Sequence, residues 1–392
     1  MRRLCRLLAI IVSITTACAQ EPATFYAGPF AVGTTPLKDI PEVSGLVASY
    51  LNPGLIWMHN DSGDEPRLFA LTLPGNLIAS VRLEGASHLD WEDIARGPGP
   101  VSNVAYLYVA DIGDNSARRS SVTVYRIREP RLDTAQRGLR MAIPADSIER
   151  LTLRYPDGAR DAEALLVDPR SGDIVIVTKR ENRCRVYSVA APHTGGSDRT
   201  MRFEGELPLQ LITGGDVSPN GSTIILKNYL YVRAWTRSSG STLAAALTGS
   251  GTPLPYMPEG QGEAIGFSAD GSGYYTTSEC ERAGPPAAIY YYPAVPQRSI
   301  NSGMLRDVRL PSIDVQKLEA TTYRVRYTVP EIERISLTVH NSAMFKVMTL
   351  AEDTAESGVQ EREFDARKLG SGSFVIVLQT MSTRVSALLE IP

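Results

Sequence analysis

Short apolar runs recur along the chain, and turn-forming or acidic residues separate them. The runs Leu46-Val47-Ala48 and Leu55-Ile56-Trp57-Met58, for example, flank the turn Asn52-Pro53-Gly54. Proline presets one backbone angle, and Gly and Asn accept positive φ, so this segment predicts a hairpin between two strands. No long segment has helical periodicity, and the pattern therefore predicts an all-β protein.

Groups of four predicted strands repeat, and each group begins at an acidic residue. These openings lie at Glu42, Glu92, Glu163, Asp216 and Glu263, which are 50, 71, 53 and 47 residues apart. The longest step contains an excursion from Glu129 to Ser147. Four short strands at a period of roughly 40–50 residues are typical of β-propeller blades. We therefore predict a five-bladed β-propeller over residues 20–311. A series of plain β-sandwiches is the alternative, but it would not repeat an acidic opening at the spacing of blades.

Two segments leave the blade number open. The leader that contains Phe30-Ala31-Val32, together with residues 293–312, could form a sixth blade. Residues Leu305 to Leu310 could instead be the outer strand of the fifth blade.

The pattern changes after Leu310, because the acidic openings stop. Apolar and polar residues alternate in Tyr323–Val329 and in Ile335–Val339, as expected for strands with one buried face. Residues 312–392 are enough for a small domain that folds alone. We predict a small β-sandwich there.

This last segment resembles the C-terminal sorting domain of proteins exported by the type IX secretion system. The matching residues are Tyr327-Thr328-Val329-Pro330-Glu331, Ile335 to His340, Lys346 to Leu350 and Leu369 to Leu378. The resemblance implies an Ig-like sandwich that engages the secretion machinery. The sequence departs from the family at Met344, where Gly is common, and lacks its Pro-Asn-Pro entry. An Ig-like accessory domain without a sorting role is the alternative.

The N-terminus has the pattern of an export signal. Arg2, Arg3 and Arg6 precede the apolar stretch Leu7 to Ile14, and small residues at Ala17-Cys18-Ala19 offer a cleavage site. We predict a signal peptide over residues 1–19 and a location outside the cell or on its outer surface. A lipid anchor on Cys18 is the rival, but Thr15 stands where such a signal has a large aliphatic residue.

The charge and the cysteine content limit which partners the protein can bind and which disulfides it can form. The net charge is −3, from 40 Lys and Arg against 43 Asp and Glu, which offers no basic face for nucleic acid. Cys184 and Cys280 remain in the mature chain without a CxxC motif. They could form a disulfide in an exported protein or stay as two buried thiols.

Acidic residues at strand ends are the candidate site, because the loops at one end of a propeller converge. The stretch from Leu89 to Ala95 and the run from Asp111 to Asn115 carry more acids than their counterparts. Carboxylate and amide oxygens suit Ca²⁺, which takes six to eight oxygen ligands. The candidate metal ligands are Asp61, Glu92, Asp111, Asp114, Asn115 and Glu163, and the candidate binding residues are Glu42, Asp216, Glu263, Lys179 and Lys227. The alternative is that these acids cap turns and that the two lysines neutralise them.

The openings Asp161-Ala162-Glu163-Ala164 and Gly262-Glu263-Ala264 resemble those of exported bacterial propellers of the phytase-like or esterase-like kind. The resemblance implies a hydrolase activity, and this implication rests on analogy of fold alone. No Gly-x-Ser-x-Gly elbow or phosphate-binding loop is present, so no catalytic residue is assigned. The sequence predicts an exported binding module for a protein, a polysaccharide or a phosphate ester. A calcium-assisted phosphoesterase or lactonase is the alternative.

Overall fold

The computed structural model describes residues 25–36, 38–280, 286–295, 312–329, 332–341, 346–380 and 384–392. The predicted signal peptide, its Cys18 and the segment Leu305 to Leu310 lie outside the described residues. In the described part the chain is almost entirely β-structure, as the sequence predicts. One short helix, α1 (Leu243–Ala246), and two 3₁₀ turns are the exceptions there.

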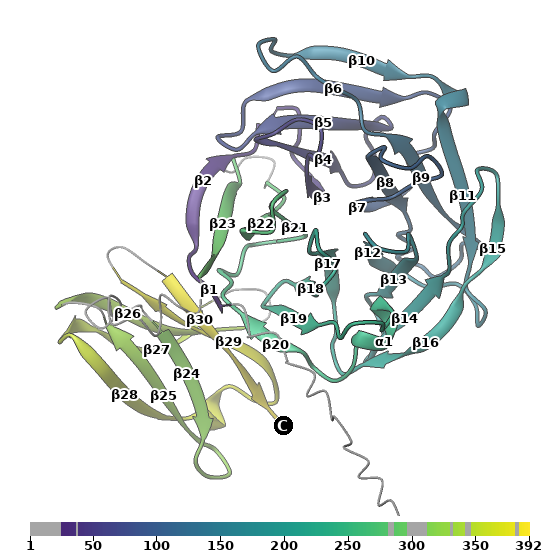
Figure 1. The fold of residues 1–392 in the computed structure, drawn as a ribbon. Coiled ribbons are helices and arrows are strands. Elements are labelled where there is room, and N and C mark those ends of the chain that lie inside the picture. Colours follow the sequence, from purple (N-terminus) through teal and green to yellow (C-terminus); the bar gives the residue numbers. More distant parts are fainter. Residues whose placement is uncertain are drawn as a thin grey trace, which may run out of the picture.

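Five sheets follow one another along the first three quarters of the chain (Figure 1). The first holds β3 (Val43–Ala48), β4 (Leu55–Asn60), β5 (Arg67–Thr72), β6 (Leu77–Leu83) and β10 (Leu139–Ile143). The second holds β7 (Trp91–Gly97), β8 (Tyr106–Asp111), β9 (Val122–Arg128), β11 (Ile148–Arg154) and β15 (Asp198–Thr200). The third holds β12 (Ala162–Val167), β13 (Ile174–Thr178), β14 (Cys184–Val189) and β16 (Arg202–Leu207). The fourth holds β17 (Ile212–Val217), β18 (Thr223–Asn228), β19 (Val232–Thr236) and β20 (Thr252–Leu254). The fifth holds β21 (Ala264–Phe267), β22 (Gly273–Thr277), β23 (Ala288–Val295), β1 (Phe25–Tyr26) and β2 (Phe30–Thr34).

The innermost strands β3, β7, β12, β17 and β21 pack beside one another in a closed circuit, a propeller-like arrangement (Figure 1). An apolar cluster fills each gap between neighbouring sheets. Members from both sides are Trp57 and Leu107, Tyr108 and Leu165, Leu166 and Leu226, Ile225 and Ile265, and Leu46 and Ile289. Radial packing thus buries both faces of sheets that would expose them alone.

The N-terminal leader supplies the outer strand of the fifth sheet. Phe30 pairs with Tyr291 and Thr34 pairs with Ala288, so β2 lies antiparallel to β23. The leader residues that could have belonged to a sixth blade are therefore part of the fifth sheet. The first and last segments of the ring are joined by backbone hydrogen bonds.

The excursion from Glu129 to Ser147 returns to the previous sheet. Its strand β10 runs parallel to β6, with Leu139 opposite Ala79 and Ile143 opposite Leu83. The second sheet receives β15 in the same way, parallel to β11. Each addition covers an outer edge that would otherwise expose unpaired N–H and C=O groups.

The C-terminal segment forms two further sheets. One contains β24 (Ser312–Lys317), β25 (Thr322–Val329) and β28 (Gly358–Asp365). The other contains β27 (Lys346–Ala355), β26 (Glu333–His340), β29 (Gly372–Gln379) and β30 (Arg384–Ile391). Val325, Tyr327, Leu337, Ile376 and Leu378 are buried in one core between the sheets.

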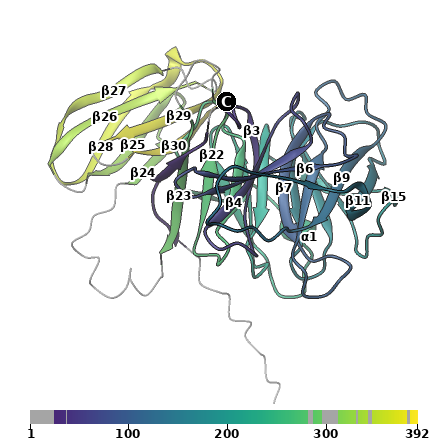
Figure 2. The same cartoon turned by 90° about the horizontal axis from the view of Figure 1, so that it is seen from above.

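This second unit contacts the ring at the loop after β18. Leu230 of that loop is buried against Val375 and Val377 of β29, with Tyr229 and Tyr231 packed beside them. The two units lie side by side in both ribbon views (Figures 1 and 2).

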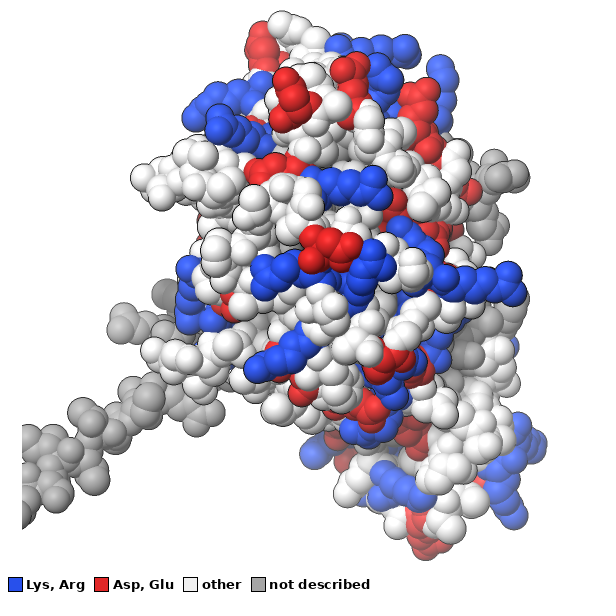
Figure 3. Space-filling model, turned by 90° about the vertical axis from the view of Figure 1, so that its right-hand side faces the viewer, with Lys and Arg blue, Asp and Glu red and all other residues white. Residues whose placement is uncertain are grey.

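Charges of both signs are interspersed on the face of the ring that carries β11 and β15 (Figure 3). Within the described residues, no helix is long and apolar enough to cross a membrane. Cys184 and Cys280 are both buried and both free, which decides between the two alternatives left by the sequence.

Candidate functional site

Four of the five inner strands, β3, β7, β12 and β17, have a β-bulge close to their first residue. The register shifts between Val43 and Gly45, between Trp91 and Asp93, between Ala162 and Ala164, and between Ile212 and Gly214. The bulged residues are therefore Ser44, Glu92, Glu163 and Thr213. Bulges redirect side chains and are common beside functional sites. Here the bulges place Glu92 and Glu163 of neighbouring sheets at the same end of the ring. We call this end of the ring the acidic mouth.

Two groups of carboxylates, which share Glu92 and hold five residues in all, meet at the acidic mouth. Ligand oxygens of Asp61, Asp90 and Glu92 lie within 4.8 Å of one another, and so do those of Glu92, Asp161 and Glu163. Glu92 thus belongs to both groups and is 3% exposed. The other four come from the loop after β4 and from the starts of β7 and β12.

The two groups differ in their charge balance. Asp161 pairs with Arg180 Nε at 2.5 Å and accepts from the N–H of Asp114 at 2.8 Å. Glu163 pairs through Oε1 with Lys179, which also lies 3.7 Å from Glu263. For Asp61, Asp90 and Glu92, by contrast, no ion pair to a cationic side chain is present among the described residues. The group of Asp61, Asp90 and Glu92 therefore consists of carboxyl groups that no paired cationic side chain compensates among the described residues.

Two buried oxygens at the acidic mouth have no hydrogen-bond partner. They are Oδ1 of Asp61 and Oε2 of Glu163, apart from Oδ2 of Asp161, which also lacks a hydrogen bond but pairs with Arg180. The side chain of Glu163 is 3% exposed. An unpaired buried carboxylate oxygen costs free energy that a bound cation would recover.

Burial and like charges raise the pKa values of these acids. Burial, followed by the charges of Glu263 and Asp90, raises the pKa of Asp61 to about 7. Burial, then Glu163 and Asp61, raises the pKa of Glu92 well above its usual range. The pKa of Asp90 is also raised, first by burial and then by Asp161. The same groups that repel one another would each be stabilised by a shared cation.

Gly113 makes the close approach of the acids possible. A Cβ atom on Gly113 would lie 2.1 Å from Glu92 Oε1 and 2.5 Å from Asp90 Oδ2. Only a residue without a side chain leaves room for both carboxylates at this position. The N–H of Gly113 donates to the backbone oxygen of Asp90 at 3.1 Å, which fixes the loop.

The run from Asp111 to Asn115 is occupied by structural contacts. Asp111 pairs with Arg119 at 2.8 Å and accepts from the N–H groups of Leu89 and Asp90. Asp114 accepts from the N–H of Arg119 at 2.6 Å. Asn115 accepts from Arg180. These three predicted ligands shape the loops of the acidic mouth and hold their oxygens on protein donors.

The candidate binding residues divide between the acidic mouth and other places. Lys179 and Glu263 face the mouth, and the hydroxyl of Tyr229 donates to Glu263 at 3.0 Å. The charge of Glu42 acts on Glu279, whose pKa is raised to about 8 by burial and by Glu263. Lys227 is fully buried and lies 3.4 Å from Glu259.

Asp216 lies away from the acidic mouth. It stands near the end of β17, where its carboxylate accepts from the N–H groups of Val217 and Phe267, each at 2.7 Å. The sequence treats Asp216 as equivalent to Glu92, but the bulge registers make Thr213 the equivalent residue. The spacing of acidic residues could not reveal this equivalence, because the bulged residue of the fourth inner strand is Thr213 and not an acid.

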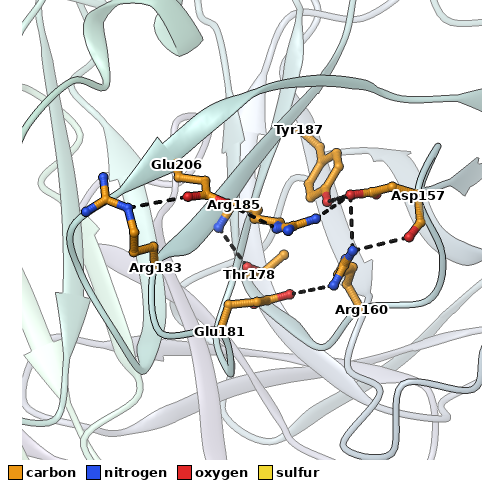
Figure 4. A network of polar contacts seen from close by, with 8 residues as sticks. All are labelled: Asp157, Arg160, Thr178, Glu181, Arg183, Arg185, Tyr187 and Glu206. Atoms are coloured by element: carbon orange, nitrogen blue, oxygen red, sulfur yellow. Dashed lines mark hydrogen bonds and ion pairs between the residues drawn. The ribbon is translucent and has the colours of Figure 1, made fainter.

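An outer network braces the segment that leads into β12 (Figure 4). Asp157 accepts from the hydroxyl of Tyr187 at 2.9 Å and pairs with Arg160 and Arg185. Arg160 also lies 3.4 Å from Glu181. Since Arg160 directly precedes Asp161, the network fixes the backbone that carries one of the five acids.

Sequence reasoning placed the site in the acid-rich stretch that contains Asp90, but it named neither Asp90 nor Asp161 among the candidate ligands. A signal was present: Asp90-Trp91-Glu92 and Asp161-Ala162-Glu163 share an Asp-x-Glu pattern at the start of two successive inner strands. Residues two apart in a strand point to the same side. Both acids of each pair could therefore have been assigned to the acidic mouth.

No family model and no curated protein matches this chain. Solved structures to which this chain is similar include a nidogen–laminin complex, with 13% identity and a TM-score of 0.34 over 60% of this chain and 72% of that chain. A second is PorZ, a surface component of the type IX secretion system of Porphyromonas gingivalis, with 11% identity and a TM-score of 0.31 over 94% of this chain. The match spans 50% of PorZ, about half its length. A third is a proposed 6-phosphogluconolactonase from Bacteroides uniformis, with 14% identity and a TM-score of 0.29 over 83% of this chain and 89% of that chain.

Proposed function

We propose that this protein is an exported binding module, a five-bladed β-propeller followed by an Ig-like sandwich, whose acidic mouth holds a divalent cation. The observation that carries the proposal is the group of Asp61, Asp90 and Glu92, three converging carboxylates with no cationic side chain paired to them. Glu163, whose Oε2 is unpaired, is the proposed fourth ligand, because it lies with Glu92 in the second group.

The donor set favours calcium. All four side chains offer hard oxygen atoms, and Ca²⁺ accepts an irregular shell of six to eight such ligands at ~2.3–2.6 Å. Zinc is disfavoured because no His or Cys belongs to either described group. The cation would leave coordination positions toward solvent, where an oxygen-rich ligand such as a polysaccharide, a phosphate ester or an acidic protein surface can bind.

Calcium titration followed by thermal unfolding tests the proposal. Saturating Ca²⁺ should raise Tm, and chelation should lower it, because a ligand that binds only the folded state stabilises it. Glu92→Gln and Asp90→Asn should remove the Ca²⁺-dependent shift. Glu84→Gln, an exposed acid that pairs with Arg82 away from the mouth, should keep it. A Tm that is unchanged by both Ca²⁺ and chelator would contradict the proposal.

A hydrolase is the second candidate, and one observation favours it. Asp61 lies beside Asp90 and Glu92 with its Oδ1 unpaired, and burial raises its pKa to about 7, which suits a group that exchanges a proton near neutral pH. A screen of phosphate esters and lactones, with and without Ca²⁺, tests this function. Turnover that is lost in Asp61→Asn but kept in Glu84→Gln would support it, and the absence of turnover would leave the binding module.

The C-terminal sandwich supports export as part of the proposal. Most of the residues that resemble a type IX sorting domain lie on β25, β26, β27 and β29 of the sandwich, whereas Pro330 and Glu331 lie outside the described residues. Deletion of residues 313–392 should trap the protein in the periplasm. Normal surface delivery of the shortened chain would rule out the sorting role.

A further inference from the structure

A cavity opens at the end of the ring opposite the acidic mouth. The mouth lies where β7 and β12 begin, and this cavity lies where they end. It has a volume of about 390 Å³. Its lining includes Arg96, Tyr106, Val104, Pro169 and Pro219, which belong to three different sheets or to the turns that follow their inner strands. Cavities of ~300–1,000 Å³ with an apolar lining and few polar groups are typical of small-molecule sites.

Arg96 is the cationic group of this cavity, and it has no acidic partner within ion-pair distance among the described residues. Its Nη2 makes only long contacts of 3.4 Å to the backbone oxygens of Ser268 and Ala269. Its Nη1 has no acceptor but is buried from solvent, so the donors left for a ligand in the cavity are those of Nε and Nη2. Asp216 is near enough for Arg96 to lower its pKa, but both oxygens of Asp216 accept from backbone N–H groups. The guanidinium therefore retains donors for an anion.

Tyr50 stands at the rim of the cavity with 68% of its surface exposed. Its loop is nevertheless held firmly, because buried Glu129 accepts from the N–H groups of Tyr50 and Leu51, each at 3.2 Å. Glu129 also accepts from Trp57 Nε1 at 2.9 Å. An exposed aromatic ring on a fixed loop loses little entropy when a ligand packs against it.

We infer that this cavity binds a small ring-bearing carboxylate, with the carboxylate on Arg96 and the ring against Tyr50. A planar guanidinium matches a carboxylate with two parallel hydrogen bonds. The aromatic and proline side chains offer flat apolar surfaces to either an aromatic ring or a sugar ring. The inference is independent of the cation site, because no residue of the acidic mouth lines the cavity.

Isothermal titration with four probes tests the site and separates the two kinds of ring. Benzoate and benzamide have nearly the same shape but differ in charge, and they probe an aromatic ring. Glucuronate and glucose differ in charge in the same way, and they probe a sugar ring. We expect benzoate or glucuronate to bind, and the neutral partner of each pair to bind at least roughly tenfold more weakly. Binding of benzoate alone identifies an aromatic acid, and binding of glucuronate alone identifies a uronic acid.

Variants locate the binding in the cavity. Arg96→Gln should weaken the binding of the active probe at least about tenfold, and Tyr50→Ala should weaken it as well. Arg82→Gln, whose exposed side chain pairs with Glu84 elsewhere, should leave binding unchanged. Because Tyr50 is largely exposed, Tyr50→Ala keeps the test valid if Arg96→Gln fails to fold. Binding of neither carboxylate by the wild type, or unchanged binding in Tyr50→Ala, would overturn the inference.

Discussion

Asp93 on β7 accepts a hydrogen bond from the N–H of Leu165 on β12 at 2.8 Å, and so one sheet of the ring holds the next. The same oxygen lies 3.3 Å from the N–H of Gly215 on β17. Asp216 repeats the device, since it accepts from the N–H of Phe267 on β21. Buried carboxylates thus join four inner strands.

Asp93→Ala should destabilise the ring strongly. The change leaves the N–H groups of Ile94 and Leu165 without acceptors in a fully buried place, at a cost on the order of 3 kcal/mol. Urea unfolding of the wild type and the variant measures the loss. Asp198→Ala, which removes an exposed partner of Arg154, should cost less than about 1 kcal/mol. Equal losses in the two variants would contradict a bridging role for Asp93.

The pH dependence of stability should carry the signature of Asp216. Burial raises its pKa from 3.8 to about 6, so the folded state holds this proton more tightly than the unfolded state. Its contribution is therefore fully present below pH 4 and falls as the pH rises to about 6, by on the order of 3 kcal/mol. Asp216→Asn should remove this part of the decline in unfolding free energy between pH 4 and pH 7.

Asp270 provides a control of opposite sign. Hydrogen bonds from Ser272 and Ser268 lower its pKa to about 2. Its contribution is therefore present above pH 4 and is lost as the pH falls. Asp270→Asn should reduce stability at pH 7 relative to pH 3. If the effect of the substitution on unfolding free energy changed with pH in the same direction for Asp216→Asn and Asp270→Asn, the opposite pKa shifts assigned to these two residues would be refuted.

Lys179→Met should destabilise the protein at pH 7 and do so less at pH 5. The change leaves Glu163 and Glu263 at the acidic mouth without their shared cation, which costs on the order of 3 kcal/mol when both are ionised. At lower pH the acids can protonate, because burial raises the pKa of Glu163. Thermal unfolding at both pH values measures the difference. Arg82→Met, at an exposed pair, should show little change at either pH.

Gly113→Ala should impair cation binding while it leaves the ring folded. The new methyl group would overlap with Glu92 and Asp90, so these carboxylates must move apart. We expect Ca²⁺ affinity, measured by calorimetry, to fall by at least about tenfold, which is the effect of ~1.4 kcal/mol. Gly260→Ala is the matched control, since an added Cβ there meets no atom within 4 Å. Wild-type affinity in Gly113→Ala would show that these two acids are not ligands.

The all-β character and much of the acidic mouth could be predicted from the sequence, because both follow from local patterns. Alternation and turn residues gave the inner hairpins, and the acids at Glu92 and Glu163 do lie together. The equivalence of Asp216 with them could not be predicted, because it depends on a bulge. One extra residue in a strand changes which side chain faces the mouth, and spacing along the chain does not reveal it.

Pairings between distant segments were also beyond the sequence. The segment from Leu139 to Ile143 carries no mark of its partner, and its place beside β6 depends on an edge that needs covering. The leader strand from Phe30 to Thr34 likewise carries no mark of its partner β23. Such contacts are determined by the whole fold.

The pairing of β2 with β23 has a consequence for how the protein is made. Every sheet but the fifth is assembled mainly from residues that are neighbours in the chain, so most of it can form while synthesis continues. The fifth cannot be completed until Tyr291 has been synthesised and has met Phe30, a contact of long sequence separation that costs loop entropy. Until then the apolar faces of the first and fifth sheets lack part of their cover. A chain interrupted before β23 should therefore be a poor folder and a good substrate for proteases, whichever ligand the finished protein binds.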